Sequence, residues 1–302
     1  MRTSAPLPPS TVELEGPWSH EYLHTRGLRL HAAVLGKPGA PLVLCIHGTI
    51  GGWFDYVGVL EPLAAAGFRV AALDLRGYGL SDKPPVELGQ DMRVLIGDIT
   101  GVIQALGYED AVLIGSDSGA SLAWSVAAER PERVTGVVSI SGAHPSDLRC
   151  AVANRPWDFA WILVRNAGTR LPMPLLSRIP RSLLVRTNAR LNVSTRAADT
   201  AHLEQALQLR ERGMRIGNTV RGAVWNQRLL TAPLPGAAHH RVQAPVLFFH
   251  ANQGLWKPVI KRAQLRAQRV HPVHIPGTKN LPHVEAPQAF AAAVAEWLRA
   301  IR

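Results

Sequence analysis

The segment Gly115-Ser116-Asp117-Ser118-Gly119 centres a carboxylate between two glycines, each two residues away. It follows an apolar run at residues 111–116 and precedes a helical pattern at 120–129. This spacing is typical of a strand–turn–helix elbow, which is too sharp for larger side chains and presents its central residue clear of the sheet. Asp117 would also face a helix N-terminus, whose dipole stabilises an anion. Such a carboxylate could attack carbon as a nucleophile or transfer a proton.

The elements that must position Asp117 alternate between strand and helix, which predicts an α/β protein with a mostly parallel sheet. Two short runs, 20–25 and 28–35, predict a hairpin. Continuous apolar runs predict strands buried on both faces. These buried strands are 41–47, 69–74, 111–116 and 134–141. Further strands are predicted at 244–250 and 272–275, and the predicted helices are 59–67, 91–106, 120–129, 259–268 and 286–301.

The alternation stops near residue 142 and resumes near 244, and the chain between has a helical composition. We therefore expect a helical insertion at 146–240 in a core made of 18–145 and 241–302. The proline-rich residues 1–17 are expected to form a flexible arm.

The insertion carries most of the charge, because 146–240 holds 14 Arg, no Lys and five acidic residues in a chain of net charge +11. Either these helices have a solvated basic face, or they meet an anionic or carrier-bound small-molecule substrate or an acidic partner. No nucleic-acid module is evident. No apolar run would span a membrane or serve as a signal peptide. The two cysteines, Cys45 and Cys150, indicate free thiols in a cytoplasmic protein. We predict no metal and no cofactor, and one sequence predicts no oligomeric state.

Several motifs in order then resemble the α/β-hydrolase superfamily, in particular its epoxide hydrolase and haloalkane dehalogenase branch. They are the elbow, His47-Gly48-Thr49, residues 74–85, Gly142-Ala143-His144-Pro145 and residues 281–287. The resemblance covers residues 16–301. It implies the α/β-hydrolase fold, a mostly parallel sheet flanked by helices, with a helical cap inserted after the sixth strand.

The resemblance also implies a mechanism. Asp117 would attack a saturated carbon of an epoxide or alkyl halide and form an ester, which a histidine, oriented by an acid, would hydrolyse with water. The backbone N–H groups of Thr49 and Ser118 would form the oxyanion hole.

The catalytic partners of Asp117 depart from that pattern. Glu285 and Pro287 set a register in which the histidine position is Asn280, and Asn is no general base near neutral pH. His283, three residues on, is either a substitute base or a loop histidine beside the site. The acid position corresponds to Gly254, which cannot function as an acid, or, in the dehalogenase arrangement, to Ser141.

The cap departs as well. All four tyrosines lie outside 146–240, and Gln227 or Asn226 stands where the resemblance places a cap tyrosine. Several other residues could line a pocket or pack in the core. They are His47, Trp53, Ser141, His144, Trp157, Trp161, Trp225 and Gln227.

Three functions stay open. The first is a hydrolase of epoxide hydrolase type with an impaired second step. The second is a non-hydrolytic cyclase, lyase or isomerase that uses Asp117 as acid or base. The third is a non-catalytic small-molecule binding protein.

Overall fold

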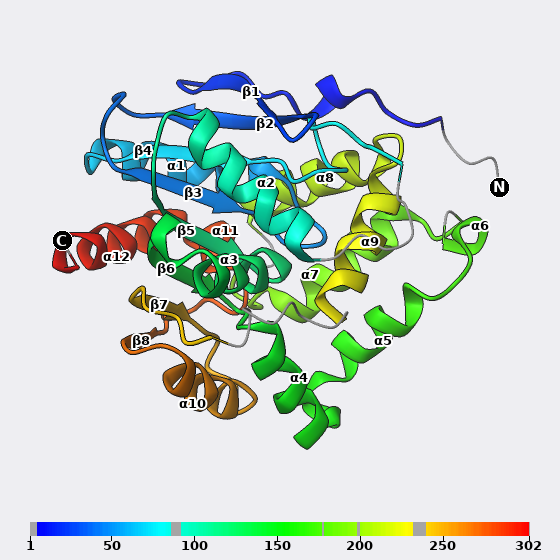
Figure 1. Cartoon of the computed structure of the whole chain (residues 1–302). Coiled ribbons are helices and arrows are strands. Elements are labelled where there is room, and N and C mark those ends of the chain that lie inside the picture. The colour runs from blue at the N-terminus through cyan, green and yellow to red at the C-terminus, as the bar shows by residue number, and fades with distance from the viewer. Residues whose placement is uncertain (1–4, 86–91, 177, 198–199, 232–239, 302) are drawn as a thin grey trace.

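A computed structural model describes residues 5–85, 92–176, 178–197, 200–231 and 240–301. Its centre is an eight-stranded sheet in the order β1-β2-β4-β3-β5-β6-β7-β8 (Figure 1). The β1–β2 and β2–β4 pairs are antiparallel and the other pairs are parallel, so the predicted α/β-hydrolase fold is confirmed. The strands are β1 (Ser19–Thr25), β2 (Leu28–Leu35), β3 (Leu42–Ile46), β4 (Arg69–Leu73), β5 (Ala111–Ser116), β6 (Val134–Ile140), β7 (Val246–Phe249) and β8 (Val270–Val273).

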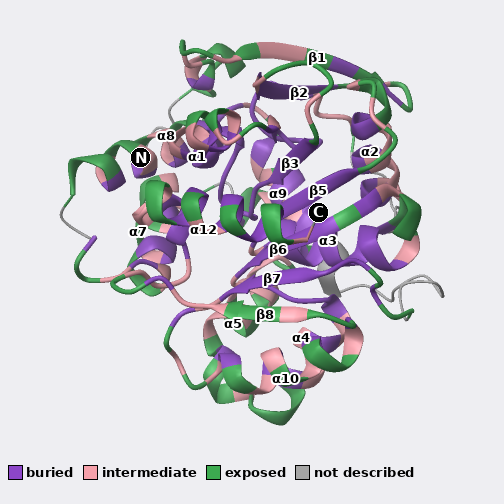
Figure 2. Cartoon of the chain, turned by 90° about the vertical axis from the view of Figure 1, so that its left-hand side faces the viewer, coloured by how far each residue is buried: buried purple, intermediate pink, exposed green. Residues whose placement is uncertain are grey.

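Helices cover both faces of the sheet, which explains the continuous apolar strands. The central strands β3 and β5 are buried at every residue (Figure 2). The helices of the core are α1 (Val57–Ala65), α2 (Met92–Ala105), α3 (Ser118–Glu129), α10 (Trp256–Arg266), α11 (Pro282–Glu285) and α12 (Pro287–Ala300), with 3-10 turns η1 (Pro9–Val12), η2 (Trp53–Tyr56) and η3 (Pro131–Arg133).

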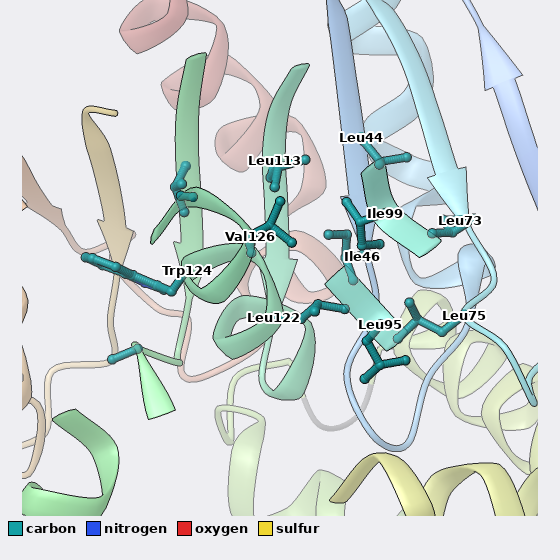
Figure 3. Packing of buried hydrophobic residues seen from close by; sticks show 14 of the residues in the cluster. Leu44, Ile46, Leu73, Leu75, Leu95, Ile99, Leu113, Leu122, Trp124 and Val126 are labelled. Carbon is teal, nitrogen blue, oxygen red and sulfur yellow. The ribbon is translucent and has the colours of Figure 1, made fainter. Parts of the chain in front are cut away.

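Successive side chains of a strand point to opposite faces, so each strand supplies two clusters of apolar residues. In β3, Leu44 and Ile46 pack on the side of α2 and α3, whereas Val43 and Cys45 pack on the side of α1 and α12. Figure 3 shows the first cluster, in which leucines of neighbouring strands face the apolar sides of α2 and α3. These two layers hold the strand ends, and thus the elbow, in place.

The chain between β6 and β7 forms the helices that we call the cap helices. Phe159 and Val185 of this segment belong to the same apolar cluster as β3 and α3, so cap helices and sheet share one core. The cap helices are α4 (Pro145–Asn154), η4 (Pro156–Phe159), α5 (Ala160–Gly168), α6 (Met173–Leu176), α7 (Arg181–Asn192), α8 (Ala201–Arg215) and α9 (Thr219–Thr231).

The flexible arm expected at 1–17 needs correction, apart from residues 1–4, which lie outside the described residues. Val12 is fully buried, and its carbonyl accepts a hydrogen bond from the Trp53 indole at 3.0 Å. Leu7 pairs with Ile216 at the end of α8. The arm therefore packs against both the core and a cap helix.

The last strand is shifted from its predicted place at 272–275. It spans Val270–Val273 and pairs only with β7 among the described strands. Pro272 is tolerated there because an edge strand needs no backbone donor on its open side.

Candidate active site

The turn at Asp117 has the geometry of a nucleophile elbow. β5 ends at Ser116, α3 begins at Ser118, and Asp117 between them has φ 51° and ψ −113°. A Cβ on Gly115 would lie 2.3 Å from the Gly119 carbonyl oxygen, and one on Gly119 would lie 2.3 Å from the Ile46 carbonyl oxygen. Both glycines are therefore required by close backbone contacts.

Asp117 is held by an arginine of a cap helix. Arg165 of α5 donates from Nη1 to Asp117 Oδ2 and from Nη2 to Oδ1, each at 3.0 Å, and the Thr49 amide donates to Oδ2 at 3.4 Å. Burial raises the pKa of Asp117, but the charge and hydrogen bonds of Arg165 outweigh it, so the pKa lies below its ordinary value. Asp117 is thus an anion near neutral pH.

Asn280 lies in a ring of hydrogen bonds. Its Oδ1 accepts from Ser141 Oγ and from Trp256 Nε1, both at 3.3 Å, and its Nδ2 donates to Asn192 Oδ1 at 3.0 Å. Its backbone amide donates to the Asn192 carbonyl at 2.9 Å. This ring joins the loop after β8 to the end of α7.

The contact with Ser141 bears on the two positions considered for an orienting acid. Ser141 touches Asn280 from the end of β6 and has φ 47°. Within the described residues Gly254 forms no hydrogen bond with Asn280, and a Cβ on Gly254 would meet nothing within 4 Å. Geometry therefore favours Ser141 as the position from which an acid would reach residue 280.

His283 lies away from Asp117, in the core. It is 1% exposed on α11, its ring stacks on Tyr56 at 5.0 Å, and neither ring nitrogen has a hydrogen-bond partner among the described residues. Burial lowers the pKa of His283 to about 3, and the charge of Arg210 adds to this effect. The ring is thus neutral and enclosed, which speaks against the substitute base considered from sequence.

Thr49 and Gln227 meet where the loop after β3 contacts α9. Thr49 Oγ1 donates to Gln227 Oε1 at 3.0 Å, and Gln227 in turn donates to Asn166 of α5. Ser118, the other residue expected at the oxyanion hole, is the buried first residue of α3. Gln227 therefore links the loop after β3 to α5, the cap helix that bears Arg165.

A cavity of about 270 Å³ lies over Asp117. Of the predicted residues, Asp117, Ser141, Trp161 and Asn280 line it. The cavity also meets residues that sequence reasoning missed, and no local motif marks them. They are Arg165, Asn192, Arg210, Trp256 and Lys279.

The other residues proposed as pocket walls lie elsewhere, and their surroundings explain them. The Trp53 indole is buried against the arm, and Trp157 is 83% exposed. Trp225 lines a separate pocket of about 140 Å³ beside Arg76.

Two buried histidines that were considered as pocket residues accept hydrogen bonds from backbone amides. His47 Nε2 accepts from the Leu75 amide at 3.1 Å, and His144 caps α4 by accepting from the Ser146 amide at 3.3 Å.

Comparison with known proteins identifies the family. A model described as the alpha/beta hydrolase fold matches residues 41–255, so the chain belongs to this family. Epoxide hydrolase B of Mycobacterium tuberculosis is 41% identical over 124 residues, which are 40% of this chain and 35% of that protein. Epoxide hydrolase 4 of Mus musculus is 36% identical over 147 residues, 48% of this chain and 41% of that protein. The match thus spans well under half the length of these relatives.

Solved structures share the fold over nearly the whole chain. Epoxide Hydrolase A from Mycobacterium thermoresistibile superimposes with a TM-score of 0.72 at 23% identity, covering 93% of this chain and 98% of that one. An F128A mutant of an epoxide hydrolase from Bacillus megaterium gives 0.76 at 21% identity, covering 92% and 100%. In the described part of the chain, no helix is long and apolar enough to cross a membrane, and no three His, Cys, Asp or Glu side chains gather as a metal site would need.

Proposed function

We propose that this chain is an epoxide hydrolase-like enzyme that forms an ester on Asp117 but lacks the group that hydrolyses it efficiently. The observation that carries the proposal is Asp117 itself, an ionised carboxylate on a strained elbow that faces a cavity large enough for a small molecule. The epoxide hydrolase relatives support the substrate class.

The first step needs only groups that are present. Asp117 Oδ1 would attack a ring carbon, the ring C–O bond would break, and the ring oxygen would take a proton from solvent. An alkyl halide would instead release halide. Thr49 donates to Asp117 Oδ2, the oxygen that stays as the ester carbonyl.

The second step needs a base that Asn280 does not provide. An amide has no lone pair basic enough to take a proton from water. The described residues nearest to Asn280 by hydrogen bonding are Ser141, Asn192 and Trp256, which are not bases either. The ester is therefore expected to persist.

The ion pair with Arg165 favours a second candidate, a non-catalytic small-molecule binding protein. Arg165 occupies both carboxylate oxygens of Asp117, so no attack occurs until the guanidinium moves. A cyclase, lyase or isomerase would have to use Asp117 as a base, because the lowered pKa leaves little of the protonated acid.

Intact-protein mass spectrometry tests these candidates. The chain and its Asp117→Asn variant are incubated with styrene oxide, a primary alkyl bromide and an activated ester. A mass increase equal to one epoxide or alkyl group, stable for hours and absent in Asp117→Asn, is the expected result. If the wild-type chain shows no adduct and no turnover, the proposal is overturned in favour of binding or of proton-transfer chemistry.

A further inference from the structure

The formal charges that line the cavity over Asp117 cancel, but one of the acids is paired with an arginine outside the lining. Three acids and three bases line it: Asp55, Asp117, Asp158, Arg165, Arg210 and Lys279. Each acid has an arginine partner, because Asp117 pairs with Arg165, Asp55 with Arg210 and Asp158 with Arg155 outside the lining. The Lys279 ammonium forms no ion pair among the described residues, although the Lys279 backbone amide donates to Glu285 Oε1 at 3.0 Å, so this positive charge at the cavity wall has no direct counter-ion.

The Arg165 fork is already shaped for a carboxylate. It grips Asp117 through two parallel N–H···O bonds of 3.0 Å, the bidentate geometry in which guanidinium recognises carboxylates most strongly. Its Nε–H is buried and has no acceptor within the described residues. The guanidinium of Arg165, the fork, therefore has one N–H without an acceptor while it binds Asp117. If the guanidinium turns to another carboxylate, it loses no hydrogen bond at Nε.

We infer that the cavity takes small molecules that carry one carboxylate, which the Arg165 fork and Lys279 bind in exchange for Asp117. A single negative charge balances Lys279. When the ligand's carboxylate takes the fork, Asp117 Oδ1 is uncovered and faces the rest of the ligand. The inference names the substrate class of the proposed function, and it rests on that function only in taking this cavity as the substrate site.

Binding of a matched, unreactive pair tests the inference apart from any chemistry. Phenylacetate and phenylacetamide have nearly the same shape and differ by one charge. By isothermal titration calorimetry, we expect phenylacetate to bind roughly ten- to a hundredfold more tightly, the range expected of charge-assisted hydrogen bonds. Asp117→Asn should tighten phenylacetate binding a further tenfold or so, because a neutral amide competes less well for the fork.

Two variants, each of which replaces one arginine at or near α5 with glutamine, test whether Arg165 itself carries the preference. Arg165→Gln should abolish the preference for phenylacetate, whereas Arg170→Gln, at an exposed arginine just after α5, should keep it. Arg165→Lys, which keeps the charge but not the fork, should retain only part of the preference, and it serves if Arg165→Gln fails to fold.

Any of three results would overturn the inference. The first is equal affinity for phenylacetate and phenylacetamide, and the second is a preference for phenylacetate that survives Arg165→Gln. The third is that Asp117→Asn binds neither probe at a probe concentration of 10 mM. These results are separable from the adduct experiment. Loss of adduct formation with retained phenylacetate preference would refute only the proposed function. Adduct formation with styrene oxide and no carboxylate preference would refute only this inference.

Discussion

Asn280 occupies a position from which a histidine could reach both an acid and the cavity. Ser141 touches it from the end of β6, and its φ of 47° is a conformation that Asp tolerates better than most residues. Two substitutions would therefore place a base at residue 280 beside an orienting acid at residue 141.

We predict that Asn280→His with Ser141→Asp shortens the lifetime of the Asp117 ester by a hundredfold or more, the usual contribution of a general base. Time-resolved intact mass measures the decay of the adduct. Asn280→Gln, which adds length but no basic nitrogen, is the control and should leave the lifetime unchanged. An unchanged lifetime in a folded double variant would show that water, not the base, is missing from the site.

Sequence predicted the elbow residues well because their spacing forms a recognisable motif. Gly115 is required by its contact with the Gly119 carbonyl in the same turn, and Gly119 by its contact with the Ile46 carbonyl of the neighbouring strand β3. Arg165 could not be found in this way, because it reaches Asp117 from a helix 48 residues further along the chain. Nothing in the sequence distinguishes it from the other arginines of the insertion.

At the scale of elements, α11 is a short helix that buries a titratable ring. It was missed from sequence because it has four residues and begins at Pro282, where no helical periodicity can develop. His283 on this helix packs between Tyr56 and Phe290. A neutral imidazole on this helix therefore stacks on Tyr56.

We predict that His283→Phe makes the protein more stable in mild acid. Burial lowers the pKa of His283 to about 3 from an ordinary 6.5, so the unfolded chain binds more protons between these values and stability falls as pH drops through them. His283 should therefore lower the free energy of unfolding at pH 5 by about 2 kcal/mol relative to pH 8.

Urea denaturation at pH 5 and pH 8 measures this difference. The phenylalanine variant should lose that part of the pH dependence, and it breaks no hydrogen bond because neither ring nitrogen has a partner among the described residues. His271→Phe, at an exposed position on β8, is the control for general effects of removing a histidine. If the free energy of unfolding changes with pH in the same way for the wild-type chain and for His283→Phe, the lowered pKa of His283 is contradicted.

Secondary structure was predicted most accurately where an element is buried on both sides. β3 and β5 are buried at every residue and almost entirely apolar, so their extents follow closely from composition. The predicted bounds of β8 are shifted because it is an edge strand whose two middle residues, His271 and Pro272, are exposed, so no apolar run marks its extent. The arm was misjudged because the burial of Val12 depends on Trp53, a contact that no local pattern encodes.

At the scale of the whole molecule, a buried ion pair joins a cap helix to the core. Arg210 of α8 donates to Asp55 of η2 at 2.8 Å, and the two side chains are 4% and 2% exposed. The arm reinforces this junction by pairing with Ile216 at the end of α8. The cap helices are therefore fastened to the core at both charged and apolar contacts.

We predict that Arg210→Met lowers the free energy of unfolding by about 3–5 kcal/mol, because it leaves the Asp55 carboxylate buried without a partner. The double variant Asp55→Asn with Arg210→Met should recover part of this loss. Chemical denaturation of the four chains of this double-mutant cycle measures the coupling. If the losses in the free energy of unfolding of the two single variants add up to that of the double variant, the ion pair does not couple the cap helices to the core. Arg186→Met, on an exposed pair with Glu204, is the matched control and should cost less than about 1 kcal/mol.

The hydrogen bonds around Asn280 couple the stability of the fold to the introduction of a base. Histidine at residue 280 would remove the amide that donates to Asn192 Oδ1, and so would weaken the attachment of the end of α7 at the same moment that it supplies a base. With serine at residue 141 that base has no acid to orient it, so the single substitution carries the structural cost without the full gain.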